Sequence, residues 1–427
     1  MIKSFIIEIF RIVNKSKDAK RVISNFSYLS ILQIGSYVLP ILTYPYLARV
    51  IGVEGFGKIA FAMSIVVYFT TITDWGYNFS ATRDVPRNRE NLDSISKIYS
   101  VVTSSKLFLL FVSAIIMVIL IFSVPQLKED FLVYILSFSI VIGQTIFPEW
   151  LFQGLENMKF MVILNIISKL IFTMLIFIFI KSPNDYVLQP LFAGCGYILS
   201  GVISLYFIHR KMKLRFKVSN FREIYVSIKN SFDVFLNNLM PNLYTSVSVL
   251  ILGFWGGSVA NGILDGASKF YSICAQFLSV MSRAFFPFLS RKLEKHSIFV
   301  KIKLSMTIVL ALILFLGADF FINTFLTNSF RESVLPLRIF AISLIFHSLT
   351  NIYGTNYLIL IGKEEVLRRI TVLISILCFI LAFPLIYYFS YIGAVLTISF
   401  ARVLLGSIVY IIAKKEKNKR LQIGVLN

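Results

Sequence analysis

Charged residues are scarce in this chain of 427 residues: they make up 15% of it, against about 25% in ordinary soluble domains. Acids are especially few, with 21 Asp and Glu against 42 Lys and Arg. Hydrophobic residues account for 57%, and the mean hydropathy is +0.80. These values exclude a water-soluble globular protein and predict an integral membrane protein.

Cysteine and histidine occur only three times each. Cys195, Cys274 and Cys378 stand alone inside hydrophobic runs without CxxC spacing, so neither a disulfide nor a zinc site is indicated. Of the histidines only His347 falls within a predicted membrane span, which is too few for a metal cluster. We therefore expect no metal and no cofactor.

Long loops are missing as well. No predicted exterior loop exceeds about ten residues, and no interior loop can hold a soluble domain. A membrane glycosyltransferase or a polymerase would be expected to carry a large loop with paired catalytic residues. We therefore expect that the protein is not an enzyme, has no catalytic residues, and works through groups placed among its helices.

The chain does contain many long apolar runs, each near the roughly 20 residues that cross a bilayer core. Twelve are predicted, at about 24–50, 57–80, 103–124, 131–152, 160–181, 187–208, 231–253, 258–283, 304–326, 334–361, 370–389 and 391–413. The predicted fold is an all-α polytopic membrane protein with about 12 transmembrane helices in two six-helix parallel-repeat lobes around a central cavity.

Basic residues alternate from loop to loop. With a cytoplasmic N-terminus, the interior segments hold 32 Lys and Arg and the exterior loops hold 4. This bias places both termini in the cytoplasm, and it explains the net charge of +21 without a nucleic-acid partner. The predicted domains are a basic interfacial N-terminal segment (1–23), an N-lobe (24–209), a basic cytoplasmic linker (210–230), a C-lobe (231–413) and a basic cytoplasmic tail (414–427).

Short matches between the two halves indicate an internal duplication. Gly154 and Glu156 follow the fourth span, and Gly362 and Glu364 follow the tenth, both at an offset of 208 residues. Ile51-Gly52 and Leu252-Gly253 similarly follow the first and seventh spans. Each match is weak alone, but together they occur at corresponding points, as parallel repeats of transporters do.

The eighth span has a polar stripe. Its members are separated by three or four residues and so share one helical face: Asp265, Lys269, Ser272, Gln276, Ser279 and Arg283. The stripe runs about 27 Å at 1.5 Å per residue, close to the thickness of the hydrocarbon core. It either lines a water-filled path or forms a buried seam in which Asp265 and Lys269 are a structural ion pair.

Amide, hydroxyl and aromatic side chains recur in other spans. They are Gln33, Tyr37 and Tyr44 in the first, Asn238, Asn242 and Thr245 in the seventh, and Arg338, His347, Asn351 and Tyr353 in the tenth. Such groups can hydrogen-bond sugar hydroxyls and stack on the apolar face of a pyranose. They can equally form hydrogen bonds between helices.

Ionisable residues inside a membrane are costly and usually face a cavity or a partner. Arg49 follows two kinking prolines near the outer mouth, where it either snorkels to headgroups or binds a ligand. With Lys269, Arg283 and Arg338 it would make a cavity cationic from mouth to base, suited to an anion. For Lys169 and Arg402, on otherwise apolar spans, pairing with a buried acid is the favoured interpretation.

Acids are rarer in the spans. Asp74 stands nine residues before Arg83, so the two could form a gate lock or a plain interfacial ion pair. Glu149 follows Pro148 near the inner end of the fourth span. Protonation of Asp74 or Glu149 would couple transport to a proton gradient, and Asp265 is a third candidate for coupling or gating.

Four blocks carry a resemblance to a known family. "PYLARVIGVEGFG", "TDWGYNFSATRDVPR", "PEWLFQGLENMKF" and "GASKFY…FFPFLSR" resemble the Wzx-type O-antigen flippases, the polysaccharide-transport branch of the multidrug/oligosaccharidyl-lipid/polysaccharide exporter superfamily. The similarity runs from about Asn25 to Ala413. It implies two six-helix lobes around a cationic cavity lined mainly by the first, second, fourth, seventh, eighth and tenth helices.

The resemblance also implies positions and partners. Cavity positions would be Arg49, Asp74, Glu149, Lys269, Arg283 and Arg338, while Lys169 and Arg402 would be peripheral. The implied activity is transfer of undecaprenyl-diphosphate-linked oligosaccharide from the cytoplasmic to the periplasmic leaflet of the inner membrane, by a monomer that works beside other O-antigen assembly proteins.

Two function hypotheses follow. In a flippase working by alternating access, the four cations would bind the diphosphate, and Asn238, Asn242, Tyr44 and Gln276 would contact the sugars. The alternative is a cation- or drug-exporting antiporter of the same superfamily, which would be expected to use acids as its main cavity charges. The sequence does not distinguish one sugar repeat unit from another, nor a proton-coupled cycle from an uncoupled one.

Overall fold

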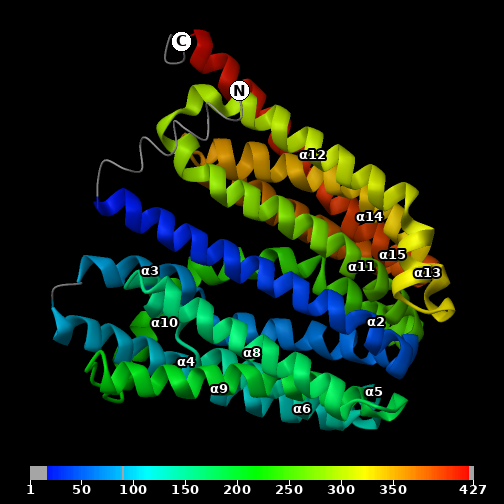
Figure 1. Ribbon diagram of the computed structural model, residues 1–427, viewed down its shortest axis with the longest axis horizontal. Helices are drawn as coiled ribbons and strands as arrows, with labels where there is room; N and C mark the ends of the chain where they lie inside the picture. The colour runs from blue at the N-terminus through cyan, green and yellow to red at the C-terminus, as the bar shows by residue number, and fades with distance from the viewer. Residues whose placement is uncertain (1–16, 89–90, 423–427) are drawn as a thin grey trace.

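The computed structural model describes residues 17–88 and 91–422 (Figure 1). The first half contains α2 (Lys17–Asp74), α3 (Tyr77–Arg87), α4 (Leu92–Ser123), α5 (Pro125–Glu129), α6 (Phe131–Ile146), α7 (Glu149–Gly154), α8 (Met158–Phe179), η1 (Pro183–Val187) and α9 (Leu188–Arg210). The second contains α10 (Phe221–Leu239), η2 (Met240–Leu243), α11 (Ser246–Arg291), η3 (Leu293–Lys295), α12 (His296–Leu316), α13 (Ala318–Phe325), η4 (Asn328–Ser333), α14 (Val334–Leu349), the π-helix η5 (Thr350–Leu358) and α15 (Glu364–Gln422). Most of the predicted N-terminal segment lies outside the described residues.

Nine helices in this described part of the chain are long and apolar enough to cross a membrane, and its secondary structure is helical without strands. The predicted all-α multi-pass class is therefore confirmed. Three of these helices contain one non-helical residue each: Gly52, Gly257 and Ser390. Each break falls between two spans expected from hydropathy, while the number of crossings and the side of the termini stay predictions.

The first two breaks have the same backbone geometry. Gly52 has φ 66° and ψ −176°, and Gly257 has φ 76° and ψ −177°, a region that essentially only glycine adopts. They are 205 residues apart. The sequence comparison had matched Gly52 to Gly253, which is four residues before Gly257. That match was wrong, because the equivalent positions are the two glycines with the same backbone conformation.

A second pair of turns repeats at an offset of 206 residues. Asn157 donates from its backbone N–H to the Phe152 carbonyl at 2.8 Å, and Lys363 donates to the Leu358 carbonyl at 2.8 Å. Both bonds close a helix end over a left-handed residue, Glu156 in one half and Gly362 in the other. The predicted match of Gly154 to Gly362 was therefore wrong by two residues.

The helices form two groups (Figure 1). One group contains α2 to α9, and the other contains α11 to α15. The groups splay apart toward the end that holds α3 and the last turns of α15, and they converge toward the end that holds α5 and α13. We call them the N-lobe and the C-lobe.

The connection between the lobes is tied to the N-lobe. Three backbone N–H groups at every second residue, from Arg215 to Ser219, donate to serine hydroxyls at every fourth residue of α4. The acceptors are Ser96, Ser100 and Ser104, at 3.2, 3.0 and 3.1 Å. The donors and acceptors have nearly the same spacing, because two extended residues advance about 6.6 Å and four helical residues advance about 6 Å.

At the convergent end the lobes touch through backbone. A Cβ added at Gly57 would lie 1.6 Å from the carbonyl oxygen of Ser258, and one added at Gly262 would lie 2.0 Å from that of Val53. The two contacts are related by the same offset of 205 residues. Small residues of this kind permit close approach of membrane helices, and here the contact between the lobes is two-fold pseudo-symmetric.

Candidate functional site

A cavity of about 240 Å³ lies between the lobes. The N-lobe contributes α2 side chains between Ile59 and Val67, and the C-lobe contributes Phe340 of α14, Ile398 of α15 and much of α11. Its polar lining groups are Ser64, Thr245, Ser246, Asn261, Asp265, Ser268, Lys269 and Arg402. Among the described residues this lining contains two cations and one acid, and of the four cations predicted for a central cavity it includes Lys269.

Lys269 is the residue at which two cavities meet. Its ammonium lies 3.0 Å from an Asp265 carboxylate oxygen and 5.0 Å from the centre of the Tyr44 ring. Besides the interlobe cavity, Lys269 lines a second pocket of about 320 Å³ whose other walls are nearly all apolar. That pocket is formed by Tyr44, Pro45, Phe270, Ile273, Cys274, Leu310, Ile313, Leu314, Phe321, Phe325 and Leu326.

The position of Arg402 differs from the one that the family resemblance implied. The resemblance made it peripheral, but it lines the interlobe cavity because the second segment of α15 packs along α11. Its guanidinium lies 3.9 Å from the centre of the Tyr271 ring and donates to Ser343 Oγ at 3.2 Å. Tyr271 and Ser343 therefore take the place of the buried acid that was expected as the partner of Arg402. Neither group is charged, so the positive charge of the guanidinium can still bind an anion.

Asn261 was not singled out from the sequence. It is fully buried, lines the cavity, and neither its amide oxygen nor its amide nitrogen is hydrogen-bonded within the described residues. A buried amide without partners costs free energy unless water or a ligand satisfies it. The sequence did contain a signal for Asn261. It lies four residues before Asp265, so it extends the polar stripe of the eighth span by one turn toward the N-terminus.

The other predicted sugar contacts lie near the joint between the lobes. Asn242 donates to Thr71 Oγ1 of the N-lobe at 3.3 Å and to the Asn238 carbonyl at 3.4 Å. Its own carbonyl accepts from the Tyr68 hydroxyl at 2.8 Å. These bonds agree with the interhelical alternative that the sequence left open.

Three of the four predicted cavity cations stand apart from both cavities. Arg49 and Arg283 are exposed, and the Arg338 guanidinium lies 2.5 Å from a carboxylate oxygen of Asp319. Gln276 is also exposed. The structure therefore brings together Tyr44, Asp265 and Lys269 of the predicted site and adds Arg402, whereas a binding role for Arg49, Arg283, Arg338 and Gln276 stays a prediction.

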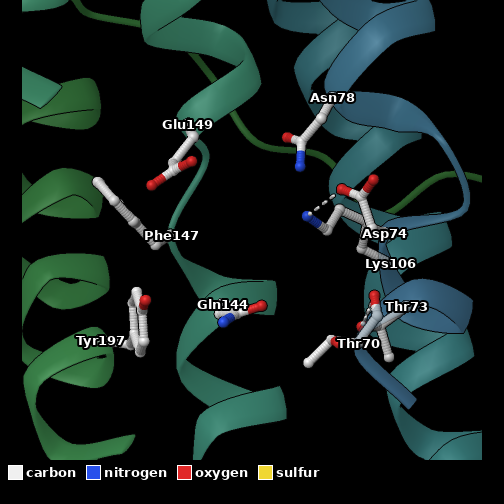
Figure 2. Close-up of a pocket in the computed structure, with 9 residues that line it drawn as sticks. All are labelled: Thr70, Thr73, Asp74, Asn78, Lys106, Gln144, Phe147, Glu149 and Tyr197. Carbon is white, nitrogen blue, oxygen red and sulfur yellow. Dashed lines mark hydrogen bonds and ion pairs between the residues drawn. The ribbon is translucent and has the colours of Figure 1, made fainter. Parts of the chain in front are cut away.

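A second polar site lies inside the N-lobe (Figure 2). This pocket, of about 160 Å³, is lined by Thr70, Thr73, Asp74, Asn78, Lys106, Gln144, Phe147, Glu149 and Tyr197. The buried Lys106 ammonium lies 3.6 Å from Asp74 Oδ1. Across the pocket, Glu149 Oε1 accepts from Asn165 Nδ2 at 2.9 Å. We call it the N-lobe acid pocket.

The predicted pairing of Asp74 with Arg83 is wrong. Asp74 is the last residue of α2, and the chain turns through left-handed conformations at Trp75 and Gly76 before α3 begins. The turn carries Arg83 to the surface, where it lies 3.3 Å from its neighbour Asp84. Lys106 takes its place because α4 packs beside the end of α2.

Lys169 lies within electrostatic range of Glu149, while its predicted pairing with a buried acid stays a prediction. Within the part of the chain that the structure describes, no three His, Cys, Asp or Glu side chains lie together so that they could hold a metal ion. The two acids of the N-lobe acid pocket are thus accompanied by cations and amides.

Comparisons with known proteins agree with this geometry. Two curated relatives bear the name "Putative O-antigen transporter". The one from Shigella dysenteriae is 31% identical, and the match covers 89% of this chain and 97% of the relative. The one from Escherichia coli (strain K12) is 26% identical, and the match covers 92% of this chain and 97% of the relative. Among solved structures, the lipid II flippase MurJ in an inward closed conformation matches with a TM-score of 0.68, at 15% identity, over 90% of this chain and 87% of that one.

The structural match to MurJ, at that identity, concerns the fold alone: the two chains share an overall arrangement of helices. A family model described as "Polysaccharide biosynthesis protein" matches residues 22–293, which include most of α2, all of α3 to α11 and all of the N-lobe acid pocket. With its relatives covered almost end to end, this multi-pass membrane protein belongs to the polysaccharide biosynthesis protein family.

Proposed function

We propose that the protein moves an undecaprenyl-diphosphate-linked oligosaccharide from the cytoplasmic to the periplasmic leaflet of the cell inner membrane by alternating access. The observation that supports this most is the place of Lys269, between a nearly apolar pocket and a polar cavity. A lipid-linked sugar has the same order of parts: an apolar chain, an anionic diphosphate and a hydroxyl-rich head.

Each part of such a substrate has a complementary group. Lys269 and Arg402 would bind the diphosphate by charge-assisted hydrogen bonds, which are stronger than neutral ones. Asn261 and Ser64 would hydrogen-bond the first sugar. Tyr44, in the wall of the apolar pocket beside Lys269, would contact the polyprenyl chain where it meets the diphosphate. The polyprenyl chain would leave through the apolar pocket, whose lining comes from α2, α11, α12 and α13.

The two lobes supply the alternation. In one access state the lobes are splayed at one end and held together by the glycine contact at the other. Rocking of the lobes against each other would close the splayed end and open the end with the glycine contact. The antiporter alternative is less well supported, because the described residues of the interlobe lining include two cations against one acid.

A deletion of the gene tests the proposal. We expect the lipid-linked oligosaccharide to accumulate on the cytoplasmic face, measured in spheroplasts with a sugar-oxidising or lectin probe that does not cross the membrane. The wild-type gene should restore outward delivery. Normal delivery in the deletion strain would contradict a flippase, and new sensitivity to cationic drugs would then favour the antiporter.

We propose further that the N-lobe acid pocket couples transport to protons through Asp74 and Glu149. In the Glu149→Gln variant we expect transport to fall about tenfold and to lose its response to a protonophore, since an amide cannot release a proton at this position. The measurement is initial transport rate with and without the protonophore. Glu129→Gln, at an exposed acid of α5, is the matched control and should behave like wild type.

A further inference from the structure

A third cavity lies within the C-lobe, away from both sites described above. It has a volume of about 470 Å³, and it is bounded by the first turns of α12, the π-helix η5 and the last turns of α15. These elements meet at the splayed end of the molecule, which the basic-residue bias assigns to the cytoplasm (Figure 1). We call this cavity the C-lobe basic pocket.

Its charged lining has one sign. Lys301 of α12 and Lys414 and Lys417 of α15 line the pocket, and the lining contains no acidic residue among those the structure describes. None of the three lysines forms an ion pair within the described residues. Three cations converging from two helices, without counter-ions of their own, favour an anionic ligand.

The floor of the pocket is aromatic and incompletely bonded. The Tyr353 and Tyr410 rings meet edge to face at 5.0 Å, and the His296 ring lies 5.0 Å from that of Tyr357. His296 Nε2 is 3.1 Å from the Ile352 carbonyl, which orients the imidazole. Tyr357 is 2% exposed, and its hydroxyl is buried with no hydrogen-bond partner in the described structure. A bound ligand would satisfy it.

The side of α12 next to the pocket is suited to acyl chains. Ile298, Ile302 and Met306 follow one another at four-residue steps, and their side chains are 40, 39 and 37% exposed. They continue along the helix from the level of Lys301 toward the membrane interior. A phosphate between the lysines and a hydrocarbon chain on this stripe would together fill the observed surface.

We propose that the C-lobe basic pocket binds the headgroup of an anionic phospholipid of the inner leaflet. Basic pockets between transmembrane helices on the cytoplasmic side are suited to such headgroups. Lys301, Lys414 and Lys417 hold the phosphate, and the Tyr357 hydroxyl donates to a headgroup oxygen. The lipid joins the start of α12 to the end of α15, so it stabilises the cytoplasmic end of the C-lobe. This site is independent of the transported substrate.

The test is binding of phosphatidylglycerol to the full-length protein in detergent, measured by native mass spectrometry against phosphatidylethanolamine. We expect wild type to retain phosphatidylglycerol selectively. The Lys301→Gln/Lys414→Gln/Lys417→Gln variant should bind it about a hundredfold more weakly. The matched control replaces Lys211, Lys213 and Lys217 of the interlobe connection, which are exposed basic residues in the same predicted cytoplasmic part, and should bind as wild type does.

Tyr357→Phe guards against a folding artefact because it changes no charge and little volume. We expect weaker binding of phosphatidylglycerol at an unchanged thermal midpoint. Equal binding by wild type and the triple-lysine variant would overturn the proposal, as would an equal loss in the control variant. Displacement of phosphatidylglycerol by inorganic pyrophosphate or by undecaprenyl diphosphate at equal concentration would also overturn it, since the site would then belong to free or substrate diphosphate.

Discussion

Replacement of Lys269 by glutamine is expected to reduce outward delivery of the lipid-linked oligosaccharide by about a hundredfold at unchanged protein level. Among the residues that the structure describes, Lys269 is the one cation that lines both the apolar pocket and the interlobe cavity. A hydrogen bond to a charged group is worth about 1.5–3 kcal/mol, and Gln removes the charge while leaving a polar side chain one methylene shorter. The measurement is surface O-antigen on gels together with the leaflet probe.

The Asp265 carboxylate complicates this variant, because loss of Lys269 would leave it unpaired, which is itself destabilising. An Asp265→Asn/Lys269→Gln double variant separates the two causes. If Lys269 binds the substrate anion, the double variant stays inactive and Lys269→Arg retains much of the activity. Recovery of transport in the double variant would show that the lysine only neutralises Asp265, and it would remove Lys269 from the binding site.

The second large effect is expected where the lobes meet. Alanine at Gly57 or Gly262 would place a methyl group 1.6 or 2.0 Å from a backbone carbonyl oxygen, far inside van der Waals contact. The oxygen belongs to a helix and cannot turn away as a side chain could, so the lobes must separate at this end. We expect transport to fall about tenfold or more, because one of the two access states can no longer close.

Spin labels at Glu54 and Val259 can measure this separation directly. Both positions are exposed, lie beside the contact, and are related by the offset of 205 residues that relates the lobes. The label distance should increase in the Gly57→Ala variant. Gly35→Ala is the control, since its methyl group would lie 3.6 Å from an Ile166 side-chain atom, an ordinary contact. An unchanged label distance with normal transport would contradict a gate at these glycines.

The candidate site was only partly predictable. Asp265 and Lys269 were found from helical spacing, and the contact of Lys269 with Tyr44 follows from packing of α11 on α2. Arg402 and Asn261 were missed as cavity residues because an otherwise apolar sequence neighbourhood does not show which face a helix turns toward its neighbours. Lys106 was counted only among interior basic residues, yet it is buried against Asp74.

Hydropathy and charge bias were enough to predict a helical multi-pass protein, because the bilayer constrains segment length and loop charge locally along the chain. The family was expected from the resemblance of four sequence blocks. Which charges face one another depends on rotation and crossing of helices far apart in sequence. Only the tertiary structure showed that Arg338 pairs with Asp319, that Arg402 reaches the interlobe cavity, and that Gly57 and Gly262 join the lobes. These are contacts between surfaces that no single segment encodes.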